Sequence, residues 1–240
     1  MKSIRNAVAV SAVLLLLTPH LAAQEASKLG DSEVTSRLAY IQHSLDGGQR
    51  AADLWWSGWL IGYSVATGGQ LATYSNSRDE KQRQDMRVGS ITTALGMGAQ
   101  LVFPLEAGWF AARLRAIPGD SPEARQVKLA TAESYLRKAA AQEALGRSWK
   151  AHALTAAVNL AAGLTIWRHY NRPAKDGLIT FAIGQLISEA QIFSQPMRAV
   201  RDLREYEQRS DFGAVGMAAD PRRTWYASVV PGGFVVGWRF

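Results

Sequence analysis

Four stretches of the chain are long, apolar and nearly free of charge, and they determine the expected architecture. At a rise of about 1.5 Å per residue, the longest can form a helix that crosses a hydrocarbon layer roughly 30 Å thick. Glu189 is the one charged residue inside the four stretches, which are residues 54–77, 88–105, 151–167 and 177–197. The pattern predicts an all-α fold built on four long apolar helices.

The ends of the stretches give evidence for and against a membrane. Residues 54–77 hold three tryptophans near one end and Tyr74 at the other, as interfacial aromatic residues do. The charged turns 75–87 and 168–176 carry four and three Lys or Arg, a density that favours cytoplasmic loops. A slightly negative mean hydropathy and the short, Ala-rich third stretch favour a soluble bundle instead. Both interpretations stay open.

Amphipathic helices flank the apolar ones. Residues 31–33 can cap the first of them, and Gly47-Gly48 is expected to end it. Its apolar stripe, at helical spacing, is Val34, Leu38, Ile41 and Leu45. A second flanking helix should start after the turn 118–123, with Ser121 as N-cap and Pro122 at its first position, and should run to about Gly146. An Arg/Glu-rich helix to about Arg209 follows the last apolar stretch.

The apolar pairs look like two copies of one unit. Residues 89–96 and 177–184 share Gly, Ile, Thr, Ala and Gly at matching positions, and each copy is entered through a tryptophan, Trp56 or Trp149. Shared Gly/Ala/Thr bias is the alternative to duplication. The expected organisation is a signal peptide, two repeated helical hairpins and a tail, at residues 1–23, 24–117, 118–210 and 211–240.

The tail changes period. Apolar residues alternate over 234–240, Trp225 starts a second strand candidate, and Pro231-Gly232-Gly233 is a turn between them. An isolated hairpin is marginally stable in water, so its aromatic face needs a surface to dock on. The expected docking residues are Trp225, Phe234, Trp238 and Phe240.

The N-terminus predicts export. Lys2 and Arg5 precede an apolar run, and the small residues before Gln24 suit cleavage after Ala23. Removing these two basic residues from 27 Lys and Arg leaves 25 against 20 Asp and Glu, a net charge of +5. In an exported chain this charge favours anionic lipid or a solvated surface over nucleic acid. The sequence has no cysteine, which excludes disulfides and thiol chemistry.

Glu189 is the sharpest functional candidate. A carboxylate inside a membrane helix is costly and indicates an ion or proton path. Gln185 lies one turn before it, and His152 and Asn159 share a face of the preceding apolar helix, so the four residues predict a polar seam. The alternative is a satisfied structural seam, or a Glu189 that lies at a water-exposed level.

Small residues predict how the helices pack. Glycines at helix-packing spacing let helices approach closely inside lipid. The expected packing positions are Gly58, Gly62, Gly89, Gly96, Gly177 and Gly184.

No catalytic or cofactor motif is convincing. Residues 62–66 have the small residues of a nucleophile elbow around Ser64 but lie in a helical pattern, and 96–98 lack the strand and third glycine of a dinucleotide loop. The histidines are too scattered for a zinc site. We therefore expect no enzyme activity and no cofactor or metal.

Three hypotheses follow. The first is a non-enzymatic membrane protein of the cell envelope, acting as a scaffold or subunit of a larger assembly, with lipid and a protein partner or second copy as its contacts. The second is a small transporter or channel subunit with Glu189 in the membrane. The third is a soluble periplasmic bundle that binds an apolar ligand between the repeats.

Overall fold

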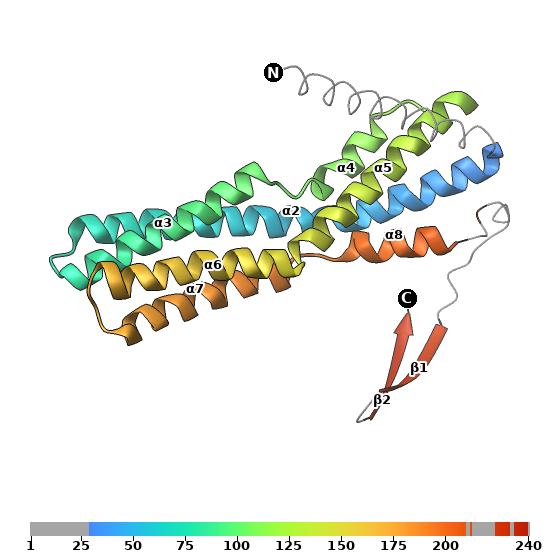
Figure 1. The fold of residues 1–240 in the computed structure, drawn as a ribbon. Coiled ribbons are helices and arrows are strands. Elements are labelled where there is room, and N and C mark those ends of the chain that lie inside the picture. The colour runs from blue at the N-terminus through green and yellow to red at the C-terminus, as the bar shows by residue number, and fades with distance from the viewer. Residues whose placement is uncertain (1–28, 210–211, 213–223, 231–232, 240) are drawn as a thin grey trace, which may run out of the picture.

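The computed structural model describes residues 29–209, 212, 224–230 and 233–239. Its body is all-helical, in agreement with the predicted class (Figure 1). The helices are α2 Asp31–Asn76, α3 Glu80–Val102, α4 Ala107–Arg115, α5 Pro122–Gly146, α6 Trp149–Leu164, the π-helical turn η1 Thr165–His169, α7 Ala174–Ser194 and α8 Arg198–Gln208. The strands are β1 Thr224–Val230 and β2 Gly233–Arg239, paired antiparallel with Trp225 opposite Trp238. The expected signal peptide and Phe240 lie outside the described residues.

Helix α2 is one continuous rod of 46 residues. The prediction that Gly47-Gly48 ends a helix is therefore wrong. The guanidinium of Arg198 lies so close to Gly47 that a Cβ there would come within 2.4 Å of it, so the glycine serves close packing inside the helix. The N-cap is Gly30, one residue before the predicted capping segment 31–33.

The other helix boundaries follow local chemistry. The start of α5 is confirmed, because the Ser121 side chain accepts a hydrogen bond from the Ala124 amide at 3.1 Å and Pro122 is the first helical residue. Helix α3 ends at Val102, just before Pro104. Proline has no N–H for an intrahelical bond, which explains why the apolar pattern beyond it continues as a separate helix, α4.

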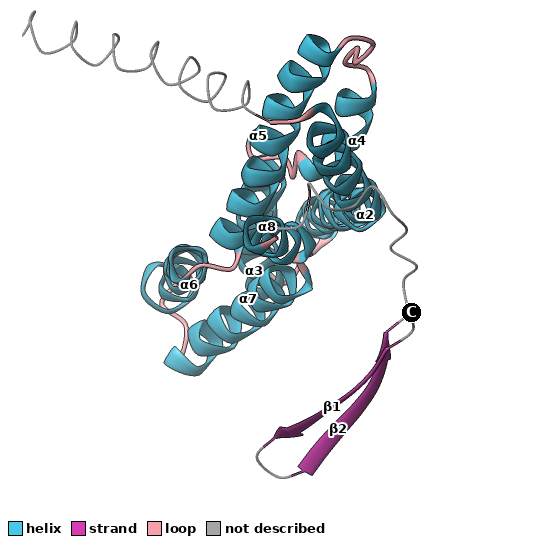
Figure 2. Ribbon diagram, turned by 90° about the vertical axis from the view of Figure 1, so that its right-hand side faces the viewer, coloured by secondary structure: helices cyan, strands magenta, loops and turns pink. Residues whose placement is uncertain are grey.

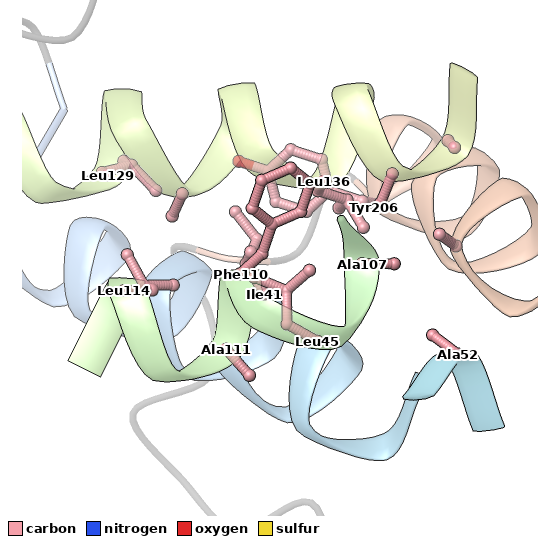
Figure 3. Close-up of a cluster of buried hydrophobic side chains, with 14 of the residues drawn as sticks. Ile41, Leu45, Ala52, Ala107, Phe110, Ala111, Leu114, Leu129, Leu136 and Tyr206 are labelled. Carbon is pink, nitrogen blue, oxygen red and sulfur yellow. The ribbon is translucent and has the colours of Figure 1, made fainter. Parts of the chain in front are cut away.

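One end of the body is a conventional bundle, here called the core bundle. It comprises the first half of α2 with α4, α5 and α8 (Figures 1 and 2). Ile41, Phe110, Leu114 and Leu136 are at most 1% exposed and meet at its centre (Figure 3). The Phe110 ring stacks on Tyr135 with centroids 4.6 Å apart. Burying such side chains contributes roughly 1.5–3 kcal/mol each, so this core holds the bundle together.

The other end, here called the four-helix end, comprises the second half of α2 with α3, α6 and α7 (Figure 1). Its apolar core is small: Val88, Ala162 and Ile166, with Tyr170 packed beside them. By length and composition, one helical stretch of the described chain, Glu80–Arg115, could cross a membrane, and 22% of its apolar window is buried. The sequence led us to expect four such helices. The other three are less apolar overall; in α7, for example, Gln185, Glu189 and Gln191 lower the mean hydropathy.

Candidate functional site

The four-helix end has its large apolar side chains on the outside. Val65, for example, is 69% exposed at the middle of the apolar part of α2. The exposed set on the four helices is Leu54, Ile61, Val65 and Leu71 of α2; Ile91, Leu95, Leu101 and Val102 of α3; Trp149, Leu154, Leu160 and Leu164 of α6; and Leu178, Ile179, Ile183, Leu186, Ile187 and Phe193 of α7. Among the described residues, the core bundle exposes only Trp109, Val127 and Leu145 in this way. The two ends of the molecule thus present different surfaces.

Apart from its small apolar core, the inside of the four-helix end is polar. The Tyr63 hydroxyl donates to Gln191 Oε1 at 2.7 Å, and Tyr63 is 9% exposed. The Thr67 hydroxyl donates to Thr93 Oγ1 at 2.8 Å, and Thr93 in turn lies 2.9 Å from Gln70 Oε1. Helices that pack through such bonds satisfy one another where water is excluded.

The predicted polar residues come together between α6 and α7. Glu189 lies 2.9 Å from His152 Nδ1 and accepts a hydrogen bond from Gln185 Nε2 at 2.7 Å. Asn159 Nδ2 donates to Gln185 Oε1 at 3.2 Å and to Ser188 Oγ at 3.0 Å. We call these five residues the polar seam.

The polar seam runs inward from one surface. The indole N–H groups of Trp55 and Trp59 each donate to Ser194 Oγ at 3.1 Å, which marks a tryptophan level at the end of α7. Glu189 is five residues before Ser194, about 7.5 Å along the helix. Its side chain is 29% exposed, whereas Asn159 is 6% exposed. Glu189 thus lies at the outer end of the polar seam and Asn159 at its buried end.

A cavity of about 330 Å³ begins where the polar seam ends. Asn159 lines it, together with Gln70, Thr93 and Thr180. Its other end is lined by charged residues beside the two hairpin turns: Asp85, Arg172 and Asp176. The cavity therefore lies between the two hairpins and has one charged end. Most of its remaining wall is apolar, from Met86, Val88, Ala162, Ile179, Ile183 and Ile187.

An ion cluster ties the two hairpins together at that end. The Arg172 guanidinium lies 2.5 Å from Asp85 on α3 and 3.0 Å from Asp176 on α7. The Arg172 side chain is 13% exposed, so this is a partly buried cluster in which two carboxylates face one guanidinium. The sequence did not single it out, because its members come from two segments that are far apart in the chain.

The glycines divide into two groups. A Cβ on Gly96 would meet the Tyr63 ring at 2.8 Å, one on Gly89 would meet Gln70 at 2.8 Å, and one on Gly184 would meet Asn159 at 2.4 Å. A Cβ on Gly177 would lie 2.5 Å from the carbonyl oxygen of Gly163. Gly177 therefore allows close backbone contact between α6 and α7, and the other three glycines lie against side chains of the facing helix.

Gly58 and Gly62 do not pack against the described part of the chain. A Cβ on either would meet nothing within 4 Å, and both are exposed on α2. Within the described residues, these two glycines therefore make no helix contact. Tyr63, on the neighbouring face of α2, makes the helix contact instead.

Two buried carboxylates of the core bundle also escaped the sequence analysis. Glu143 is 2% exposed and accepts a hydrogen bond from the Val200 amide at 3.1 Å, at the start of α8. Burial raises its pKa to about 7, against the lowering effect of the Val200 and Ala199 amides. Asp202 accepts a 2.6 Å hydrogen bond from Ser44 and pairs with Arg198. Because Glu143 lies in a largely polar helix, α5, the sequence did not indicate that it is buried.

The remaining candidate motifs have structural explanations. The Ser64 hydroxyl donates to the Leu60 carbonyl within α2, and residues 96–98 lie inside α3, so neither forms a strand-to-helix turn. Within the described ranges no three His, Asp or Glu side chains gather as a metal site would require. The side chains of the strand residues Trp225, Phe234 and Trp238 are not described.

Comparison with known proteins gives no relatives: no protein-family model matches the chain, and no curated protein or solved structure matches it significantly. The functional argument therefore rests on the geometry of the site.

Proposed function

We propose that the chain is a non-enzymatic membrane protein of the cell envelope that acts as a subunit of a larger assembly. The observation that carries the proposal is the reversed distribution of side chains in the four-helix end, apolar outside and hydrogen-bonded polar inside. In water, each large aliphatic side chain left exposed forgoes roughly 1.5–3 kcal/mol of burial. In lipid this cost disappears, and the internal hydrogen bonds become the favourable packing.

The spacing of the aromatic residues supports this placement. Trp56, near the tryptophan level, and Tyr74, near the first turn, are 18 residues apart on α2, which corresponds to about 27 Å. That span matches a hydrocarbon layer of roughly 30 Å. Arg83 lies over the Tyr74 ring at 5.1 Å, a cation beside an interfacial aromatic residue. In this arrangement the core bundle stands outside the lipid.

The orientation follows from the N-terminus and the turns. If residues 1–23 are a cleaved signal peptide, α2 begins outside the cytoplasm and the turns near residues 77–79 and 170–173 lie inside it. Their basic residues then follow the positive-inside rule. The protein is accordingly proposed to be exported, with its core bundle on the far side of the cytoplasmic membrane.

The glycine contacts support duplication of a hairpin unit. In the first hairpin, Gly89 and Gly96 of α3 face side chains of α2; in the second, Gly177 and Gly184 of α7 face α6. Both pairs are seven residues apart, and each lies on the second helix of its hairpin. We therefore propose two copies of one helical hairpin, arranged about a pseudo-two-fold axis.

Two features suit the role of a subunit. Gly58 and Gly62 form a small-residue face on α2 that meets nothing in the described chain, and such faces mediate helix association in lipid. The tail is the second feature. Its paired strands β1 and β2 offer an edge that a partner sheet can extend.

Membrane extraction tests embedding. The mature protein should stay in the membrane fraction through carbonate and high salt and should need detergent for a folded, soluble state. If it is monomeric and folded in plain buffer, the third hypothesis replaces this one. The apolar cavity of about 530 Å³ between Phe103, Leu145 and Leu154 would then be the candidate ligand site.

A deletion tests the subunit role separately. Removal of residues 224–240 should release a co-purifying partner or a second copy while the helical circular dichroism of the protein is retained. Exchange of Gly62 for Leu disrupts the other proposed contact surface, the small-residue face of α2, and serves as the second variant. If the assembly is intact in both variants, the subunit role is refuted and embedding is unaffected.

The polar seam favours a second candidate, a transporter or channel subunit. Its supporting observation is the Glu189–His152 pair below the tryptophan level, since carboxylate–imidazole pairs in membranes serve ion and proton paths. Exchange of Glu189 for Gln should abolish ion-coupled flux in vesicles. Unchanged flux would leave the polar seam with a packing role only.

A further inference from the structure

We propose that the apolar cavity of about 530 Å³ at the tryptophan level binds one anionic phospholipid, with an acyl chain in the cavity and the phosphate group beside Lys150. This inference rests on the membrane embedding proposed above and names one lipid partner of the embedded protein. The cavity lies where the core bundle meets the four-helix end, at the point where α3 and α5 end and α4 and α6 begin (Figure 1). Trp55, whose indole N–H donates to Ser194 at the tryptophan level, forms part of its wall.

The break between α3 and α4 leaves apolar side chains exposed around the cavity. Helix α3 ends at Val102, before Pro104, and the Phe103 side chain between them is 78% exposed. Leu145, near the end of α5, and Leu154, on α6, are also exposed and line the same cavity. Three helices thus present large apolar side chains to one place, which a helix without this break would not do.

The size and lining of the cavity suit a hydrocarbon chain. Ligand sites in proteins measure roughly 300–1,000 Å³ and are lined mostly by apolar and aromatic side chains. The volume of about 530 Å³ falls within this range. The apolar part of the wall comprises Trp55, Val102, Phe103, Pro104, Leu105, Leu145, Ala151 and Leu154.

The polar lining residues lie at one side, as an amphipathic ligand requires. Glu106 and Gln142 belong to the core-bundle side, Gln195 lies between α7 and α8, and Lys150 is the second residue of α6. Leu154 lies one turn further into the four-helix end than Lys150. A lipid with its head group at Lys150 therefore directs its acyl chain past Leu154 toward the hydrocarbon layer.

The carboxylate in the wall already has cationic partners. Glu106 lies 2.9 Å from the Lys138 ammonium and 3.7 Å from the Arg113 guanidinium. Its amide-bearing neighbour Gln142 accepts a hydrogen bond from the Glu106 backbone N–H at 3.2 Å. Glu106 therefore contributes little repulsion toward a phosphate group.

Two cations at the junction of α5 and α6 supply the charge for an anionic head group. Lys150 is exposed and, within the described ranges, forms no ion pair with a carboxylate. Arg147, three residues before it, donates only to the backbone carbonyls of Phe193 and Gln195. Each Lys or Arg close to anionic lipid raises the affinity about fivefold. The site should therefore prefer an anionic phospholipid to a zwitterionic one.

Lipid titration tests the head group. The full protein is extracted in a nonionic detergent and titrated with phosphatidylglycerol or phosphatidylcholine of identical acyl chains, and native mass spectrometry counts the lipid molecules retained. One phosphatidylglycerol should bind at least about fivefold more tightly than phosphatidylcholine. Lys150→Gln should reduce this preference. Equal affinities of the two lipids for the unmodified protein would refute recognition of an anionic head group.

A matched pair of variants tests the cavity. Ala151→Phe places a ring inside it and should abolish retention of both lipids, because the acyl chain no longer fits. Ala153→Phe, which is exposed on the same helix and outside the lining, should retain lipid as the unmodified protein does. Leu154→Ser with Leu160→Ser is the second pair, should Ala151→Phe fold poorly by circular dichroism. Equal retention within the pair would refute the cavity as the binding site.

Carbonate extraction of the same preparations separates this inference from the proposed function. If the protein stays in the membrane fraction but retains no phospholipid in detergent, embedding holds and the lipid site is refuted. If the protein leaves the membrane fraction, the proposed function fails and this inference fails with it.

Discussion

Val65 and Val127 offer a direct measure of what surrounds each end of the molecule. Both are valines on helices, and they are 69% and 66% exposed. Val65 lies at the middle of residues 54–77 in the four-helix end, whereas Val127 lies on α5 of the core bundle. Exchange of each for Lys adds the same charge to the same kind of surface. Under the proposed embedding, only the surrounding medium differs.

The expected magnitudes separate clearly. At the centre of a membrane helix, Val contributes about −0.3 to −0.6 kcal/mol and Lys about +2.5 to +3.5, so Val65→Lys should destabilise the embedded protein by about 3–4 kcal/mol. On a helix in water, the change at Val127 should be within about 0.5 kcal/mol, since Lys is also the better helix former. The ratio of folded to unfolded protein should thus change more than a hundredfold at one site and little at the other.

The assay is unfolding of the full protein in mixed micelles titrated with dodecyl sulfate, followed by tryptophan fluorescence and circular dichroism. Leu95→Lys, on the outside of α3, is a second lipid-facing variant that should behave like Val65→Lys. Equal, small effects at Val65 and Val127 would refute the reasoning, because they would place both surfaces in water.

Three further predictions concern packing and titration. Gly177→Ala should destabilise the protein, since its Cβ would come within 2.5 Å of a backbone oxygen. Gly58→Ala, in contrast, should be neutral or should stabilise the protein by up to about 1 kcal/mol. Equal melting temperatures of the two variants would contradict this prediction. Phe110→Ala should cost roughly 3–5 kcal/mol in the same unfolding assay, because it empties the buried centre of the core bundle. With a pKa raised to about 7, Glu143 stabilises the fold when protonated. That contribution is complete below its unfolded-state pKa near 4.5 and is lost as the pH rises through about 7, so the protein should unfold more readily at pH 8 than at pH 5. Glu143→Gln should flatten this dependence, measured as melting temperature against pH, and an unchanged slope would assign it to other groups.

The sequence predicted the helices well where the signal was local. The charge-free stretches, the Ser121 cap and the helix end near Gly146 depend on neighbours within a few turns. The predicted helix end at Gly47-Gly48 was wrong because Gly47 lies in a tertiary contact. It packs against Arg198 of α8, which is 151 residues away in the chain. Helical period cannot distinguish a glycine that ends a helix from one that receives a side chain.

The candidate site was partly predictable for the same reason. Glu189 and Gln185 are one turn apart, and His152 and Asn159 share a helix face. Helical periodicity was therefore enough to predict these four residues of the polar seam. The partners of Arg172 could not be found this way. Asp85 is 87 residues away, and only the packing of the two hairpins brings the charges together.

The uninterrupted α2 helix has a mechanical consequence. It reaches from the core bundle to the first hairpin turn, a length of about 69 Å, with no break between the core bundle and the four-helix end. A force or a binding event that tilts the half of α2 in the core bundle should tilt the half in the four-helix end with it, because a helix bends far less readily than a loop. A pull on the core bundle is therefore transmitted along α2 to the first hairpin turn.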